Sequence, residues 1–243
     1  MSVPWGARRS ALPRIWQEDP VMAHRPASEE AAEQLVAAAR HLFDTAVMSH
    51  AGHGNLSARL DAERFVLSAT GMVRHLAPDQ VATVSLGGEV LAGELGSENA
   101  EIVAMHATVY RLRPDVGGII HTHSPAATAF ALAHRELPCR AEPLLRFGQG
   151  ESVPVVPWGP RGSEVSVRGI AAVLEERPST AAALLANHGL LAFGADPMAA
   201  SRLVVAIEEA AEAELAAAVL GGAVDFPGGA LEAVRASIAR VGP

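Results

Sequence analysis

The chain has 243 residues, of which 49% are hydrophobic and 19% are charged, with one cysteine and a formal net charge of −8. A chain of this length can bury a large core without disulfides, and folds that mix helix and strand often reach this size as one domain. The single Cys139 cannot form an internal disulfide, and no apolar run reaches the ~20 residues of a membrane span. The acid excess disfavours binding to a phosphodiester backbone. We therefore expect a cytoplasmic protein that binds neither nucleic acid nor membrane.

The first third of the chain predicts a lead-in segment, a helix and a hairpin. Residues 1–27 carry scattered prolines and arginines without periodicity, so we expect an extended or partly disordered segment before one domain over residues 28–243. Apolar residues then recur at helical spacing and predict a first helix over about 29–48. Alternating apolar residues on both sides of Gly87 and Gly88 predict a β-hairpin.

The remainder interleaves helices and strands, and it contains no internal repeat. The expected helices cover residues 101–111, 124–134, 163–176 (with Ser163 as the N-cap) and, as the last long helix, 197–220. The expected strands cover residues 117–124 and 153–159 and the two halves of 180–194. This order predicts an α/β fold with a mixed or antiparallel sheet that is covered by helices.

Histidine is the residue type that carries most information about function. His121 and His123 lie two apart in a predicted strand, so both rings project from one face and can converge on one ion at about 2.0–2.1 Å. A His-x-His pair is also typical of two hydrogen-bonded histidines on a solvated strand face. The glycine and isoleucine run 117–120 before the pair indicates a buried strand, which favours the metal-binding interpretation.

A third histidine, His188, interrupts an apolar segment together with Asn187 and Gly189. An imidazole buried there without a partner would cost about 1–3 kcal/mol, so we expect it to be hydrogen-bonded or to bind a metal. Three neutral imidazoles leave a coordination position open, which is typical of a catalytic divalent metal rather than a closed structural site.

Several segments of the sequence, in order, are similar to one known family. They are the GHGNLSAR loop, LSATG, YRLRPDVGGIIHTHSPAATAFA, VPVVPWGPRGSE and LLANHGLLAFG, and together they cover about residues 30 to 220. The chain resembles the class II aldolase/adducin family, which includes fuculose-1-phosphate aldolase and ribulose-5-phosphate 4-epimerase. The resemblance implies a three-layer αβα sandwich with a central mixed or antiparallel sheet.

The resemblance also implies a metal centre and an assembly. Its ligands would be His121, His123 and His188, in agreement with the spacing argument. One divalent ion per subunit is expected, with zinc as the first choice and manganese, iron and cobalt left open. The family further implies a homotetramer with active sites at the subunit interfaces, acting on a small-molecule substrate.

The aldolases of the family use a glutamate as acid and base at the start of the helix before the His-x-His strand. The stretch GSENAEIVAMHATVYR offers two candidates, and we favour Glu101 over Glu98. Glu98 is preceded by Gly96-Ser97 and matches the local motif better, but it lies a helical turn too far upstream. An acid at either position could instead stabilise the helix N-terminus through the macrodipole.

Family members that act on phosphorylated substrates bind the phosphate with a Gly-Asn loop, a Ser/Thr-Gly turn and a Ser-Ser pair. The chain keeps the first two as Gly54-Asn55 and Thr70-Gly71, and Ser97 alone is left of the third. We expect these residues to bind substrate, together with His53 beside the loop. Whether the substrate carries a phosphate stays open, and Ser57, Arg74 and His75 could compensate for the missing serine.

The proton donor of the family aldolases, a tyrosine, has no counterpart in the expected places. The only tyrosine, Tyr110, lies upstream of the metal strand and is expected in the core. We therefore predict a divalent-metal-dependent carbon–carbon lyase of the aldolase type, which cleaves a small hydroxy-carbonyl or sugar-phosphate-like compound through a stabilised enediolate. A 4-epimerase, a decarboxylase, an iron-dependent oxygenase and an adducin-like binding module without catalysis are the alternatives.

Overall fold

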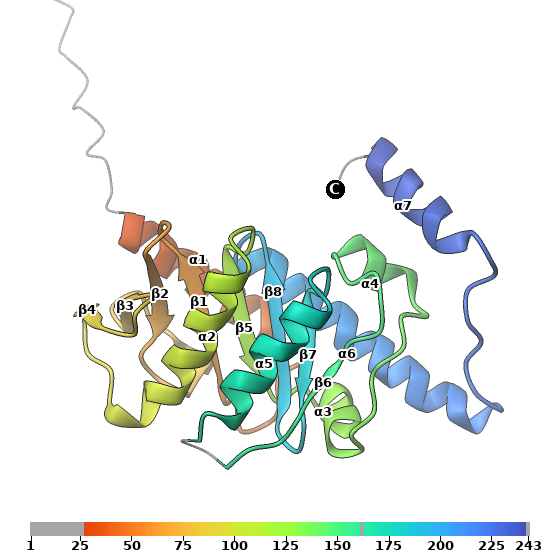
Figure 1. Cartoon of the computed structure of the whole chain (residues 1–243), viewed down its shortest axis with the longest axis horizontal. Helices are drawn as coiled ribbons and strands as arrows, with labels where there is room; N and C mark the ends of the chain where they lie inside the picture. Colours follow the sequence, from red (N-terminus) through yellow and green to blue (C-terminus); the bar gives the residue numbers. More distant parts are fainter. Residues whose placement is uncertain (1–26, 161–162, 242–243) are drawn as a thin grey trace, which may run out of the picture.

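The computed structural model describes residues 27–160 and 163–241, except for the side chains of Glu98, Leu231 and Val241. Of the predicted lead-in segment 1–27, only Ala27 belongs to the described part. Figure 1 shows the whole chain, with the helix α1 near its beginning and α7 near its end.

A single mixed sheet organises the described part of the chain. Its eight strands follow the order β4-β3-β2-β1-β5-β8-β7-β6, and every neighbouring pair is antiparallel except the parallel pair of β6 and β7. The strands are β1 (Gly54–Arg59), β2 (Arg64–Ser68), β3 (Val81–Ser85), β4 (Val90–Ala92), β5 (Gly118–Thr122), β6 (Val155–Val156), β7 (Ala182–Leu185) and β8 (Gly189–Gly194).

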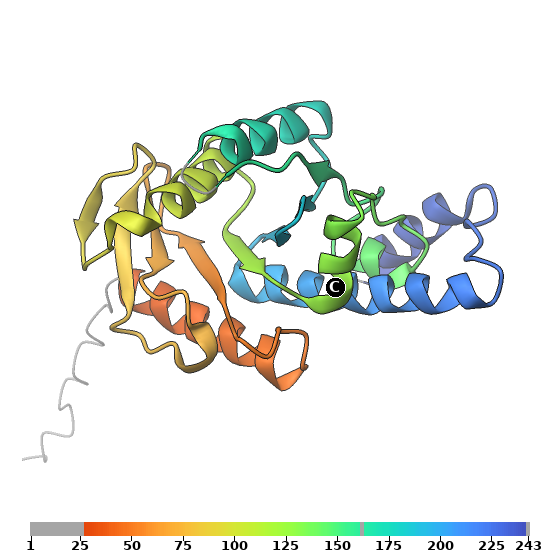
Figure 2. The same cartoon turned by 90° about the horizontal axis from the view of Figure 1, so that it is seen from below.

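Helices cover both faces of this sheet, as Figure 2 shows from below. The long helices α1 and α6 lie on one face, and α2 and α5 lie on the other. None of the described helices is long and apolar enough to span a membrane. The helices are α1 (Ala27–Asp44), α2 (Ala100–Leu112), α3 (Pro125–Leu132), α4 (Glu142–Arg146), α5 (Val165–Glu176), α6 (Pro197–Val219) and α7 (Ala230–Val241), with short 3-10 turns at Val73–His75 and Ser97–Asn99.

The two faces of the sheet bury separate cores. Leu56 of β1 and Ile120 of β5 pack with α1 and α6, whereas Ile119 packs in the core under α2 and α5. Because side chains alternate along a strand, Asn55 and His121 project toward the α2 and α5 side. Asn55 lies directly opposite His121 in the antiparallel register. The two central strands β1 and β5 therefore place polar side chains next to the apolar core under α2 and α5.

The α/β class and the three-layer arrangement with a mixed sheet are confirmed. The prediction of a cap at Ser163 is wrong, because α5 begins at Val165 with Glu164 at the N-cap position and no side-chain cap hydrogen bond. The helix α7 was not expected after residue 220. Two glycine pairs separate it from α6, and it contacts mainly α4.

A buried carboxylate joins α6 to the segment that follows the His-x-His strand. Glu208 is 3% exposed, and its two carboxylate oxygens accept hydrogen bonds from the backbone N–H groups of Ala126 (2.7 Å) and Ala127 (2.8 Å). Ser124 at the N-cap of α3 makes no side-chain cap hydrogen bond, so Glu208 supplies the missing acceptor from another helix. Burial raises the pKa of Glu208, and the two backbone hydrogen bonds oppose that rise.

Replacing this carboxylate with an amide should destabilise the protein. In Glu208→Gln, an NH2 group faces one backbone N–H, so we expect the free energy of unfolding to fall by about 1–3 kcal/mol in urea denaturation. The exposed Glu212 lies one turn further along the same helix, and Glu212→Gln should cost less than about 0.5 kcal/mol. Equal effects of the two substitutions would contradict this role of Glu208.

Candidate metal centre

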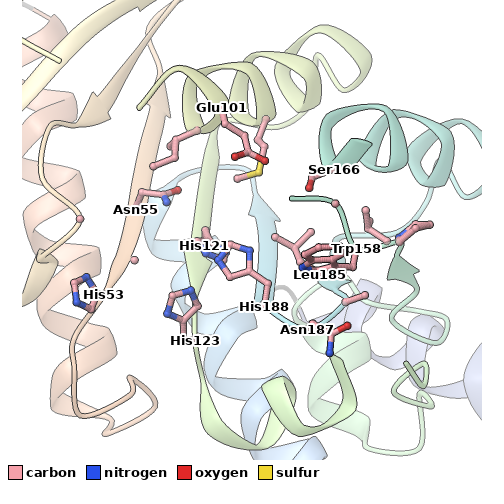
Figure 3. Close-up of a pocket in the computed structure, with 18 residues that line it drawn as sticks. His53, Asn55, Glu101, His121, His123, Trp158, Ser166, Leu185, Asn187 and His188 are labelled. Atoms are coloured by element: carbon pink, nitrogen blue, oxygen red, sulfur yellow. The ribbon is translucent and has the colours of Figure 1, made fainter. Parts of the chain in front are cut away.

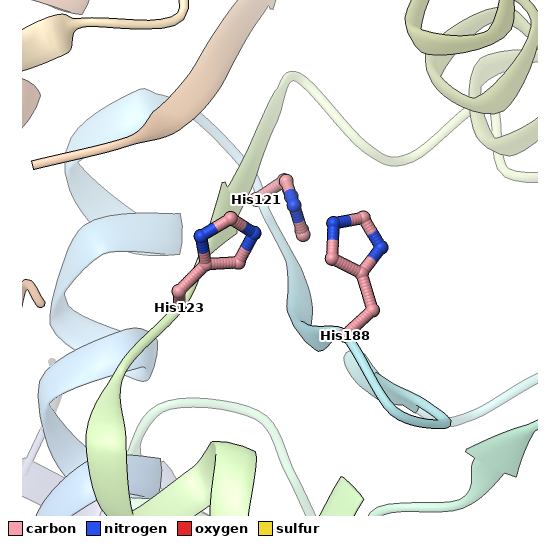
Figure 4. A group of neighbouring side chains, drawn as sticks. All are labelled: His121, His123 and His188. Carbon is pink, nitrogen blue, oxygen red and sulfur yellow. The ribbon is translucent and has the colours of Figure 1, made fainter. Parts of the chain in front are cut away.

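Three histidines from separate segments meet at one end of β5. His121 lies in β5, His123 follows that strand directly, and His188 lies in the turn between β7 and β8. One ligand nitrogen of each lies within 4.8 Å of the others, and the ring centroids are 4.9, 4.7 and 5.0 Å apart (Figure 4). The structure thus brings together the three side chains that the spacing had suggested.

Hydrogen bonding leaves two of these rings, His121 and His123, with a nitrogen lone pair for a metal. Nδ1 of His121 donates to the carbonyl oxygen of Leu190 at 2.9 Å, which leaves Nε2 as the unprotonated nitrogen. Nε2 of His123 is buried and has no hydrogen-bond partner in the described structure. Such an unsatisfied nitrogen costs about 1–3 kcal/mol unless a ligand takes it up. A metal ion at this point fits both observations.

The local electrostatics keep His121 and His123 neutral. Burial lowers the pKa of His121 well below its usual value, and repulsion from a protonated His188 or His123 acts in the same direction. Burial is also the main cause of the lowered pKa of His123, followed by repulsion from His188 and then His53. The neutral imidazole is the form that binds metals.

Two glycines allow the backbone to approach the histidines closely. A Cβ atom on residue 189 would overlap the carbonyl oxygen of Thr122 and lie 2.9 Å from Cδ2 of His123. A Cβ atom on residue 54 would lie 2.6 Å from the carbonyl oxygen of His121. The spacing of the three rings therefore depends on glycine at both positions.

The turn that carries His188 differs from the expected buried imidazole, because His188 is exposed. Its neighbour Asn187 has a left-handed backbone (φ 56°). The backbone N–H of Asn187 donates to the carbonyl of Ala131 at 3.1 Å, and Nε2 of His134 donates to its Oδ1 at 2.6 Å. The turn, rather than burial, sets the direction of the His188 ring.

The histidines lie in a cavity of about 430 Å³ that is lined by both polar and apolar side chains. Figure 3 shows His53 and Asn55 on one side of the three rings and Trp158 and Leu185 on the other. Gly54 and Gly71 also line the cavity, and its apolar side chains are those of Ile102, Met105, Val156, Pro157, Trp158 and Leu185. The cavity therefore suits a ligand that carries both polar and apolar groups.

Of the remaining candidates, some line the cavity and others do not. Glu101, in the first turn of α2, is half-buried and lines the cavity, whereas the side chain of Glu98 lies outside the described part. Thr70 does not line it, and its Oγ1 accepts a hydrogen bond from the backbone N–H of Met72 at 3.1 Å. Ser97 lines a separate surface hollow.

Three further residues bear on the site. Asn187 and Trp158 line the cavity, and the sequence reasoning had assigned neither a role. Trp158 is 57% exposed between a proline and a glycine, a pattern that could have marked an aromatic side chain held at a surface. Tyr110 is 1% exposed in the core, as expected, and does not line the cavity. The described part of the cavity thus contains no tyrosine to donate a proton.

The glycine at position 189 provides a test of the geometry. Gly189→Ala should displace the ring of His123 or the β8 turn, and we expect the affinity for Zn²⁺ to fall by at least about tenfold in a competition titration with a chromophoric chelator. Gly228 is a matched control, since nothing lies within 4 Å of the Cβ that Gly228→Ala would add. Unchanged zinc affinity in Gly189→Ala would contradict the proposed crowding.

Comparison with known proteins places the chain in a family. A family model described as the class II aldolase and adducin N-terminal domain matches residues 33–215. The chain is 30% identical over 196 residues to a methylthioribulose-1-phosphate dehydratase of Pseudomonas syringae pv. tomato, covering 77% of this chain and 95% of that protein. It is 32% identical over 162 residues to a 5-deoxy-D-ribulose 1-phosphate aldolase of Bacillus thuringiensis serovar kurstaki, covering 66% and 72%.

A solved structure supports the same fold. An L-fuculose 1-phosphate aldolase superposes with a TM-score of 0.76 over 86% of this chain and 96% of that chain, at 24% sequence identity. At this identity the likeness concerns the fold. The match of the family model over most of the chain carries the assignment, and the chain belongs to the class II aldolase/adducin family.

Proposed function

We propose that the protein is a divalent-metal-dependent lyase that cleaves a carbon–carbon bond in a small phosphorylated hydroxy-ketone. The observation that carries this proposal is the convergence of three histidines, with the unsatisfied Nε2 of His123 among their nitrogens. The adducin-like alternative without catalysis gives no reason to keep such a costly group. Among metals, zinc suits three imidazoles without a thiolate, and manganese, iron and cobalt are the alternatives.

The bound ion would supply Lewis acidity, which polarises the substrate carbonyl and stabilises the negative charge that develops as the bond breaks. His121, His123 and His188 would hold it. Glu101 lines the same cavity from α2, and we assign it the transfer of a proton to or from the substrate. No tyrosine lines the described cavity, so the residue that protonates the other fragment is not assigned.

The lining of the cavity indicates a class of substrate. Asn55, Gly71 and His53 offer donors for a phosphate, whereas Ile102, Met105 and Leu185 offer none for a hydroxyl. A ketose 1-phosphate whose far end is a methyl or thioether group fits this lining. The two curated relatives described above are named for substrates of this kind. We assign no substrate contact to Thr70 or Ser97.

Dehydration is the second candidate reaction, and the sequence patterns did not suggest it. The alignment with the dehydratase covers 95% of that protein, against 72% for the aldolase. Loss of water from a ketose phosphate begins, like cleavage, with charge developing beside a carbonyl. The same histidines and glutamate would therefore serve either reaction.

A product assay with two substrates separates these reactions. Protein loaded with Zn²⁺, Mn²⁺, Fe²⁺ or Co²⁺ would be given 5-deoxyribulose 1-phosphate or 5-methylthioribulose 1-phosphate, and the products separated by chromatography and analysed by mass spectrometry. We expect dihydroxyacetone phosphate and an aldehyde. A single product lighter by one water would show the dehydratase, and an isomer of equal mass the epimerase. Unchanged substrate with every metal would refute the proposal.

The metal ligands should be indispensable. His121→Ala and His123→Ala should each bring bound metal close to background and lower turnover at least about 100-fold, since they remove a ligand itself. Metal content is measured by plasma mass spectrometry on the same samples. His50→Ala changes an exposed histidine that does not line the cavity, and it should leave both unchanged. Full activity in a metal-free His121→Ala protein would overturn the assignment.

The homotetramer with interfacial sites and the cytoplasmic location stay predictions from the sequence. Light scattering of the purified protein would test the first. The exposed Trp158 at the mouth of the cavity would be buried if a neighbouring subunit covers the site.

A further inference from the structure

A chain of four hydrogen-bonded side chains leads from the core under α2 to the cavity. The hydroxyl of Tyr110 lies 2.8 Å from Oγ of Ser57, and that oxygen lies 2.6 Å from Nδ1 of His106. Nε2 of His106 lies 2.7 Å from Oδ1 of Asn55, which lines the cavity. All four residues are at most 5% exposed, and water therefore cannot easily replace any of these bonds.

The far end of this chain fixes the direction of its protons. Among the residues whose side chains are described, Ser57 is the only hydrogen-bond partner of the Tyr110 hydroxyl, so a satisfied Tyr110 donates to Ser57. Ser57 must then donate its own proton to Nδ1 of His106. The Nε2–H of His106 is left to donate to Asn55, which therefore presents Oδ1 to it and not the amide nitrogen.

Two further observations agree with this direction. Burial lowers the pKa of His106 to about 3, so the ring is neutral and has one donor and one acceptor nitrogen. The guanidinium of Arg59 lies 4.6 Å from the centre of the Tyr110 ring, and it donates to the backbone carbonyls of Tyr110 and Val116. Arg59 thus holds the tyrosine in place at the end of the chain.

Asn55 connects this series of hydrogen bonds to the candidate metal centre. Asn55 lies opposite His121 across β1 and β5, so its side chain is next to the candidate metal centre. With Oδ1 engaged by His106, the amide nitrogen is the side-chain polar group that Asn55 has left for a ligand in the cavity that it lines. A reversed amide would present an oxygen there and repel an anion.

We propose that His106 is a positioning residue, which fixes the amide of Asn55 so that it donates to an anionic oxygen of the substrate. The inference rests on the proposed function for the nature of that oxygen, a phosphate. His106 itself does not line the cavity and touches no reacting atom. Its effect on substrate would pass through Asn55 alone.

The test compares two probes that differ only in the phosphate. Binding of dihydroxyacetone phosphate and of dihydroxyacetone to the zinc-loaded protein is measured by isothermal titration calorimetry. We expect the wild-type protein to prefer the phosphate compound. His106→Leu removes both the donor and the acceptor and should weaken binding of the phosphate compound about tenfold or more, with zinc content and dihydroxyacetone affinity unchanged.

Two milder variants keep the test decisive if His106→Leu does not fold. His106→Gln retains a donor and an acceptor and should keep affinity for the phosphate compound within about threefold of wild type. Tyr110→Phe keeps the packing but removes the proton that sets the direction, and it should weaken only the phosphate compound. If His106 is merely structural, its substitution would instead lower the zinc content or weaken the binding of both probes alike. This result would overturn the inference.

The outcomes also separate this inference from the proposed function. A folded His106→Leu or Tyr110→Phe protein that binds the phosphate compound as wild type does would refute the role of His106. A wild-type protein that does not prefer the phosphate compound would refute it too, because Asn55 then binds no anion. If the wild-type protein prefers the phosphate compound but converts no ketose phosphate, the proposed function is refuted. In that case, loss of this preference in the variants would still support the role of His106.

Discussion

The candidate site depends on the close approach of the turn between β7 and β8 to the end of β5. Gly189 allows this approach, and the carbonyl of Leu190 accepts the Nδ1 proton of His121 across the two strands. The hydrogen bond joins two paired strands, so His121 is held by the sheet, whereas His188 is held by the turn before β8. Burial keeps His121 and His123 neutral, and the buried Nε2 of His123 has no hydrogen-bond partner among the residues that the structure describes. A metal ion would relieve that cost.

Next to this centre, the two faces of β1 carry different kinds of side chain. One face of β1 presents Leu56 to the core under α1 and α6, and the other presents Asn55 and Ser57 toward α2. The polar residues on that face are all paired within the protein, which offsets the cost of burying them. One member of this network, Asn55, also lines the cavity. The network therefore links the core under α2 to the candidate site.

Much of the site was visible in the sequence because its residues are close together along the chain or stand out in an apolar context. The spacing of His121 and His123 follows from the two-residue period of a strand, and His188 interrupts an apolar run. Other features could not be predicted this way. Ser97 was expected to bind substrate, but it lies in a 3-10 turn and lines another hollow. His188 proved exposed because a left-handed Asn187 turns it outward from two buried strands.

The α/β class, the order of most elements and the three histidines could be predicted from the sequence, because periodicity, turn residues and unusual polar interruptions are local properties. Other features became evident only in the folded protein: which residues share the cavity, the capping of a helix by Glu208 more than 80 positions away, and the hydrogen-bonded series of Tyr110, Ser57, His106 and Asn55. These facts depend on strand order and register, which pack distant segments together. No pattern within a single segment specifies such contacts.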